Sequence, residues 1–473
     1  MGDRPLAFDS STTQVSRDPE EQLVNVERLI QEHAIDTVKL GVVDIDGLWR
    51  GKRIPVEYFL RDVWRHGTHI CNILFGWDIN DDLIPGLEYT GWHTGFPDLF
   101  LVPDLSTFAV VPWEEHTAAV IADFVDGDGR PIGLSPRHVL RTVVERAASL
   151  GYKPNIGYEF EFYVFRETVD SVREKGFADL APLTPGIHTY NLYRGTLAEP
   201  LIGDLRRSMA QYGIPVEACN TEAGPGQFEI SLHYSDAMRA ADQAVLYKAG
   251  VKEIAAKHGL LASFMAKYHP EWSGSSGHIH QSLGSADATN LFYSDDAPDH
   301  LSDVARWYAA GQLATMREFT AFFCPTVNSY KRKLEKTWAS TTATWGIDNR
   351  TTGLRVLSST PQAARLEHRL PGADANPYIA VAASVAAGLW GVENRVKPPA
   401  LSSGDAYELA GAGVIELPWT LEEAVGELDR GELARELLGR EFVEHFIATR
   451  RWELLCARAA VTDWERARYL EMI

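Results

Sequence analysis

The chain of 473 residues is poor in cysteine, in basic side chains and in long apolar runs. Its four cysteines are far apart, which excludes a disulfide framework and a zinc motif and predicts a reducing compartment, the cytoplasm. The formal net charge of −20 argues against binding to nucleic acid or to an anionic membrane surface. The longest apolar run, near 378–392, is too short to span a bilayer and predicts a buried helix.

The length predicts two or more domains, because 473 residues exceed one ordinary compact domain. Residues 1–17 are polar, which predicts a mobile tail and no signal peptide. Short strand and helix patterns over 18–127 predict a small α+β domain, and the turn-rich segment 126–133 marks its boundary. The remainder, 134–473, alternates polar strands with long helices. These helices are predicted near 236–257, 301–322, 376–393 and 421–438, and the C-terminal stretch 441–469 is also helical.

The stretch 157–165 alternates charged and aromatic residues, which is typical of a strand. Glu159 and Glu161 therefore share one face, and Phe160 and Phe162 share the other. Two carboxylates on one strand face repel each other unless a cation lies between them. A divalent ion is one explanation, and a half-buried strand whose glutamates face water is the other.

Three later stretches favour the ion. Glu222 and Glu229 flank a Gly-Pro-Gly turn, and two histidines at strand spacing follow a glycine-rich loop at 276–280. In 365–369, two arginines and a glutamate fall on one strand face. These are metal-binding and phosphate-binding residue types, so a metal-plus-phosphate site assembled across several strands is predicted.

Taken in order, these motifs resemble the glutamine synthetase family from about residue 20 to the C-terminus. The resemblance rests on the Glu-x-Glu strand, the Glu222 segment, Gly-His-Ile-His at 277–280, Pro-Thr-Val-Asn-Ser-Tyr-Lys-Arg at 325–332, Asn-Arg at 349–350 with Arg355, the 365–369 stretch and Asn-Pro-Tyr at 376–378. It implies an α+β fold, in which a small N-terminal β-grasp-like domain precedes a large catalytic domain whose antiparallel sheet forms a half-barrel flanked by helices. It also implies a homo-oligomer of two stacked rings, a dodecamer, with active sites between neighbouring subunits.

The resemblance further implies an ATP-dependent ligase that phosphorylates the γ-carboxylate of glutamate and lets an amine displace the phosphate. Carboxylate is a poor acyl donor, and phosphoryl transfer depends on positioning and charge neutralisation. Two or three Mg²⁺ or Mn²⁺ ions would be held, one by Glu161, Glu222 and Glu229 and a second by Glu159, His278 and Glu367. The remaining implied roles are phosphate stabilisation by Arg350 and Arg355, glutamate binding by Gly274, Arg332 and Arg369, and ATP binding by Glu217, His280, Ser282, Arg355 and Arg365.

The sequence departs from the family where ammonium would bind. The glutamate that closes the family's site is replaced at the matching position by Trp338, which offers apolar area or a ring face to a cation. The family's ammonium-site loop is absent, and Asp78 in its region is a candidate amine-site carboxylate, presented to the next subunit. We therefore predict a glutamate–amine ligase for an organic amine. The alternatives are a glutamine synthetase that uses ammonium, a non-catalytic scaffold on the same fold, and a different phosphotransferase.

Overall fold

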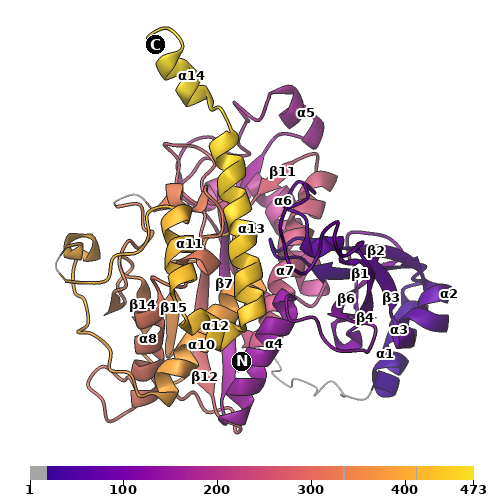
Figure 1. Ribbon diagram of the computed structural model, residues 1–473, viewed down its shortest axis with the longest axis horizontal. Coiled ribbons are helices and arrows are strands. Elements are labelled where there is room, and N and C mark those ends of the chain that lie inside the picture. Colours follow the sequence, from indigo (N-terminus) through magenta and orange to yellow (C-terminus); the bar gives the residue numbers. More distant parts are fainter. Residues whose placement is uncertain (1–18, 334–335, 412) are drawn as a thin grey trace, which may run out of the picture.

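The structure is a computed structural model that describes residues 19–333, 336–411 and 413–473. The tail predicted at 1–17 lies outside the described residues. The rest of the chain forms two sheets, each with a hydrophobic core, and helices cover the larger sheet (Figure 1). Among the described residues, no helix is long and apolar enough to cross a membrane, and the four cysteines are free.

The smaller sheet lies in the N-terminal part of the chain and has the order β2-β1-β6-β4-β3, with β5 paired to β6. Helix α1 (Pro19–Glu32) packs Val26 and Ile30 into its core. One helical segment follows β2, made of α2 (Val56–Tyr58), η1 (Phe59–Val63) and α3 (Trp64–His66). The strands are β1 (Thr37–Val43), β2 (Trp49–Pro55), β3 (Thr68–Cys71), β4 (Asp98–Pro103), β5 (Ala109–Val110) and β6 (Thr117–Val125), and the short turns are η2 (Asn72–Phe75) and η3 (Leu105–Thr107).

The larger sheet has nine strands in the order β13-β14-β15-β12-β7-β9-β8, with β10 and β11 also paired to β7. Its pairs are antiparallel except β13 with β14. This largely antiparallel sheet agrees with the half-barrel that the family resemblance implies. The strands are β7 (Lys153–Phe165), β8 (Val216–Thr221), β9 (Gln227–Leu232), β10 (Ser235–Asp236), β11 (Leu261–Ser263), β12 (Gly277–Gly284), β13 (Trp345–Ile347), β14 (Leu354–Leu357) and β15 (Arg365–His368).

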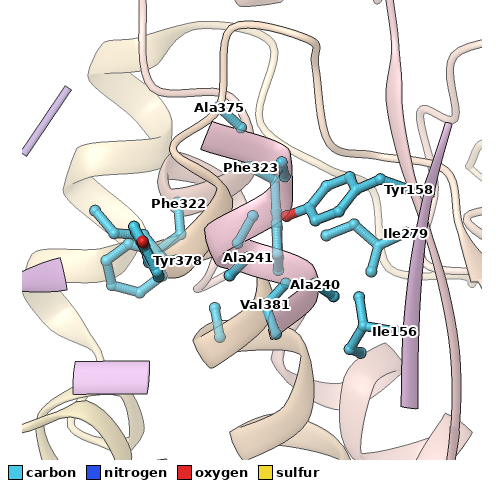
Figure 2. Close-up of a cluster of buried hydrophobic side chains, with 14 of the residues drawn as sticks. Ile156, Tyr158, Ala240, Ala241, Ile279, Phe322, Phe323, Ala375, Tyr378 and Val381 are labelled. Carbon is cyan, nitrogen blue, oxygen red and sulfur yellow. The ribbon is translucent and has the colours of Figure 1, made fainter. Parts of the chain in front are cut away.

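Four helices cover one face of this sheet: α4 (Pro136–Ser149), α7 (Ala237–Lys257), α8 (Asp303–Thr315) and α10 (Pro377–Glu393). Alternate residues of β7 point into this core, and Phe160 stacks on Tyr247 of α7 with ring centroids 5.6 Å apart. Figure 2 shows Ile156 and Tyr158 of β7 beside Ala240 and Ala241 of α7. Burial of one β7 face against helices leaves Glu159 and Glu161 on the other face.

The structure differs from the predicted helices in five places. Residues 301–322 split into α8 and α9 (Thr320–Phe323), and 421–438 split into α11 (Leu421–Arg430) and α12 (Leu433–Leu438). The C-terminal stretch splits into α13 (Arg440–Ala459) and α14 (Asp463–Tyr469), because Thr462 starts a new helix with a capping box. Helix α6 (Leu192–Gln211) was not predicted, since its internal Pro200 is a helix breaker by propensity. The short α5 (Val169–Glu174) was also missed.

Candidate active site

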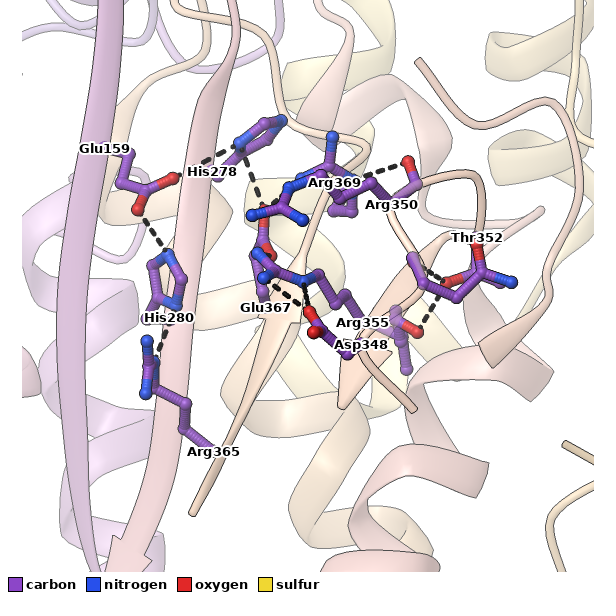
Figure 3. Close-up of polar contacts among 12 residues, drawn as sticks. Glu159, His278, His280, Asp348, Arg350, Thr352, Arg355, Arg365, Glu367 and Arg369 are labelled. Atoms are coloured by element: carbon purple, nitrogen blue, oxygen red, sulfur yellow. Dashed lines mark hydrogen bonds and ion pairs between the residues drawn. The ribbon is translucent and has the colours of Figure 1, made fainter. Parts of the chain in front are cut away.

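Strand register places the predicted site residues on one face of the larger sheet. Glu159 of β7 is opposite His278 of β12, and Glu161 is opposite Glu229 of β9. On the other side of β12, Glu367 of β15 is opposite both His280 and Arg355 of β14. Residues directly opposite on antiparallel strands share a face, so five strands contribute to one surface. Figure 3 shows Glu159, His278 and Glu367 directed toward one another from neighbouring strands.

Glu159, His278 and Glu367 form the tightest group of metal-ligand types in the described part of the chain. Their ligand atoms all lie within 4.8 Å of one another. His278 Nδ1 lies 3.3 Å from Glu367 Oε1 and 3.6 Å from Glu159 Oε2. These are the three residues predicted for the second ion, and two carboxylates with an imidazole suit Mg²⁺ or Mn²⁺.

Polar neighbours hold the Glu159 carboxylate in its ionised form. His280 Nε2 lies 3.0 Å from Glu159 Oε1, while His280 Nδ1 accepts a hydrogen bond of 3.0 Å from Arg365 Nε. Burial by itself would raise the pKa of Glu159, but His278 and His280 outweigh it and hold that pKa well below its ordinary value. Arg365 thereby fixes the orientation of an imidazole that contacts a candidate metal ligand.

The carboxylates predicted for the other ion belong to Glu161, Glu222 and Glu229, whose hydrogen bonds come mainly from backbone N–H groups. Ser276 N donates to Glu161 Oε2 at 2.7 Å, and Ala223 N donates to Glu222 Oε2 at 3.0 Å. Burial and the charge of Glu161 raise the pKa of Glu222 to about 7. Burial and the charges of Glu159 and Glu161 raise the pKa of Glu229 to about 9. Such mutual repulsion of buried carboxylates fits a site that a divalent cation completes.

These raised pKa values predict how stability depends on pH without metal. A carboxyl whose folded-state pKa lies above its unfolded value favours folding at low pH, and that contribution is lost as the pH rises through the folded pKa. Because the pKa is about 7 for Glu222 and about 9 for Glu229, the melting temperature of the metal-free protein should fall between about pH 6 and about pH 9.

Mn²⁺ should raise the melting temperature again, and by more near pH 9 than near pH 6, because carboxyl ligands must be deprotonated to bind a metal ion. Thermal melts at both pH values with chelator, with Mn²⁺ and with a monovalent salt of equal ionic strength measure this gain. An equal gain from Mn²⁺ at both pH values would contradict the assignment of these carboxylates.

One of two adjoining cavities, with a volume of about 550 Å³, contains all six predicted metal ligands; we name it the Arg332 cavity. Buried Arg332 and Arg369 line it, and Arg369 pairs with Glu367 and donates to Arg350 O at 3.1 Å. A Cβ at Gly274 would lie 2.3 Å from Arg332 Cγ, so only glycine fits there. The predicted glutamate-binding residues Gly274, Arg332 and Arg369 and the predicted phosphate-binding residues Arg350 and Arg355 thus meet in one cavity.

The second cavity, of about 770 Å³, contains Glu217, His280, Ser282 and Arg365 and is named the Glu217 cavity. These are four of the five residues predicted to bind ATP; the fifth, Arg355, lines the Arg332 cavity instead. Glu159 lines both cavities, so the metal-ligand group lies where they meet. A nucleotide in one cavity and an acid in the other would bring their reacting ends together beside Glu159.

Trp338 lines the Arg332 cavity and keeps 62% of its surface exposed. Tyr190 also lines this cavity and was missed, because its segment has neither strand alternation nor a charged pair. Asp78 lines neither the Arg332 cavity nor the Glu217 cavity as the described residues form them. Its Oδ2 accepts a hydrogen bond of 2.8 Å from Trp452 Nε1 of α13.

Comparison with known proteins agrees with this geometry. The glutamine synthetase catalytic domain model matches residues 133–469. The chain is 45% identical to a glutamate–isopropylamine ligase of a Pseudomonas species over 97% of this chain and 100% of that one. It is 40% identical to a gamma-glutamylethanolamide synthetase of Streptomyces coelicolor over 94% of each. A solved GmaS/ADP complex superposes with a TM-score of 0.83 at 29% identity, covering 94% of this chain and 98% of that one. The chain belongs to the glutamine synthetase family.

Proposed function

We propose that this protein is an ATP-dependent glutamate–amine ligase that acts on an organic amine. Glutamate, an amine and ATP would give the γ-glutamylamide, ADP and phosphate. The observation that carries this proposal is the aromatic lining of the Arg332 cavity, in which Trp338 and Tyr190 accompany the carboxylates and arginines. The names of the two curated relatives, an isopropylamine ligase and an ethanolamide synthetase, support the same substrate class.

The reaction divides between the two cavities. ATP would lie in the Glu217 cavity, and the γ-carboxylate oxygen of glutamate, anchored by Arg332 and Arg369, would attack the γ-phosphorus and release ADP. The guanidinium groups of Arg350 and Arg355 would neutralise the charge on the transferred phosphoryl group. Two or three Mg²⁺ or Mn²⁺ ions would be held by two sets of side chains, which are Glu161, Glu222 and Glu229, and Glu159, His278 and Glu367. These ions would neutralise phosphate charge.

The amine would enter beside Trp338. The amine first gives a proton to solvent, and its nitrogen lone pair then attacks the acyl carbon of γ-glutamyl phosphate. The C–N bond forms, phosphate leaves with the C–O bonding pair, and the second proton lost by the nitrogen passes to that phosphate. Trp338 presents a large apolar ring to the substrate, so an alkyl or aryl part of the amine gains affinity that ammonium lacks.

An amine panel tests this function. With glutamate and ATP present, phosphate release should be fastest with a small alkylamine such as isopropylamine, and slower with ammonium or a diamine. Trp338→Ala should lower kcat/KM for isopropylamine by about tenfold to a hundredfold while changing it little for ammonium. Trp464→Ala, which removes another tryptophan with 62% exposure, is the matched control. Fastest turnover with ammonium would favour a glutamine synthetase instead.

We further propose that the chain has an N-terminal domain at 18–127 and a catalytic domain at 134–473, and that the protein works in the cytoplasm.

We also propose that the protein forms a ring homo-oligomer. Two features support the ring. Asp78 lines neither the Arg332 cavity nor the Glu217 cavity as formed by the described residues, and a neighbouring subunit could use it. Strands β2 and β8 end their sheets, and such edges pair readily with another chain. The particle mass in solution tests the ring.

A further inference from the structure

Segment 402–409 is hydrogen-bonded to two loops that line the Arg332 cavity. The segment ends in η5 (Ala406–Leu409), whose N-cap Asp405 accepts a hydrogen bond of 2.9 Å from Tyr407 N. Asn349 Nδ2 donates to Gly404 O at 2.9 Å, and Ala406 N donates to Thr351 Oγ1 at 2.9 Å. These bonds attach the segment to the loop 348–352, which carries Arg350 (Figure 3 shows this loop).

The same segment reaches the loop that carries Trp338. The Tyr407 hydroxyl donates to Ala339 O at 3.0 Å, one residue after Trp338. The next carbonyl back, Trp338 O, accepts from Arg369 Nη2 at 3.4 Å. The carbonyls of Trp338 and of the next residue are therefore each held by a hydrogen bond, one from Arg369 and one from Tyr407.

Trp338 needs such support because its backbone is in an unusual conformation. Its φ is +65°, in the left-handed region that bulky side chains rarely adopt, and its side chain is largely exposed. An unsupported loop would relax to a more favourable φ and turn the indole elsewhere. Burial raises the pKa of the Tyr407 hydroxyl, so it stays protonated and able to donate at neutral pH.

We propose that Tyr407 is a positioning residue of the amine pocket, which acts by fixing the backbone at Ala339 and so the direction of the Trp338 ring. The inference rests on the proposed function, in which Trp338 receives the amine. Tyr407 lines neither the Arg332 cavity nor the Glu217 cavity, so its effect on substrate passes through the loop.

Tyr407→Phe removes the hydroxyl and keeps the ring. Loss of one hydrogen bond to a backbone carbonyl corresponds to about fivefold to tenfold in an equilibrium constant. We expect KM for isopropylamine to rise by about that factor, with KM for ATP changed less than about twofold. Tyr58→Phe, which removes a hydroxyl from α2 in the N-terminal part of the chain, is the matched control. Steady-state kinetics of phosphate release, with each substrate varied in turn, measure the split.

A double mutant distinguishes a role of Tyr407 in positioning Trp338 from a role in stabilising the fold in general. If Tyr407 acts through Trp338, then in a Trp338→Ala background Tyr407→Phe should produce no further rise in KM for the amine. Equal rises in KM for all three substrates, or full additivity with Trp338→Ala, would overturn the proposal.

The comparison of wild type, the two single mutants and the double mutant can still be interpreted if the proposed function is wrong. Should ammonium prove the best nucleophile, the proposed function fails, but KM for isopropylamine can still be compared among the same four proteins. Non-additivity in that KM would keep the positioning role, and additivity would end it.

Discussion

Glu229→Gln is expected to lower amine-dependent phosphate release on the order of 10³-fold, because a site for a divalent ion loses one of its charged ligands. The same substitution should not lower the stability of the metal-free protein. The pKa of Glu229 is raised to about 9 by burial and by Glu159 and Glu161, so glutamine resembles the protonated form present at neutral pH. Near pH 9, where wild-type Glu229 ionises among like charges, the variant should be the more stable protein when metal is absent.

Two measurements check these opposite effects on one variant. Phosphate release with saturating Mn²⁺ gives the loss of activity, and thermal melts with chelator near pH 6 and near pH 9 give the gain in stability. Glu174→Gln removes an exposed carboxylate from α5 and should change neither quantity. Activity close to wild type, or a destabilised metal-free variant near pH 9, would remove Glu229 from the metal site.

Arg355→Lys is expected to lower kcat on the order of 10²-fold and to leave KM for glutamate nearly unchanged. Arg355 Nη1 donates to Glu367 Oε2 at 2.8 Å, and its Nε and Nη2 donate to Asp348 Oδ1 at 2.9 and 2.6 Å. Lysine keeps the charge but loses the planar fork that these two carboxylates orient toward the cavity. Charge that develops on the transferred phosphoryl group would therefore be neutralised less well than in the wild type.

Single-turnover measurement of ADP formation with glutamate and ATP isolates the step that Arg355 should assist. Arg146→Lys is a suitable comparison, because Arg146 pairs with Glu393 at 2.6 Å between α4 and α10, outside both cavities. A rise in KM for glutamate with kcat unchanged would assign Arg355 to substrate binding instead.

Much of the candidate site could be predicted from the sequence, because many of its residues lie on strands. Alternation in 157–165 places Glu159 and Glu161 on one face, and the structure keeps both in the Arg332 cavity. The predicted trio of Glu159, His278 and Glu367 is the group that the structure brings within 4.8 Å. The metal, glutamate and phosphate roles of these residues remain predictions that the experiments above address.

Loops and helix ends were predicted less well. Tyr190 lies in an irregular segment, where no periodicity relates a side chain to a cavity. Helix α6 was missed because Pro200 has a low helix propensity. The helix forms all the same, because tertiary packing overrides the propensity of one residue. The Tyr407 contact with Ala339 joins residues 68 positions apart, and nothing local to either one indicates it.

The sequence by itself determined which residue types share a strand face, that four separated cysteines build no framework, and that the family's acids and arginines occur in order. Only the tertiary structure decided that Glu159 stands where two cavities meet and that Asp78 turns away to Trp452. The physical reason is the sequence separation of the interacting residues. Side-chain alternation follows from the backbone of one strand, whereas strand register and the hydrogen bonds that hold loops depend on segments that meet only when the chain has folded.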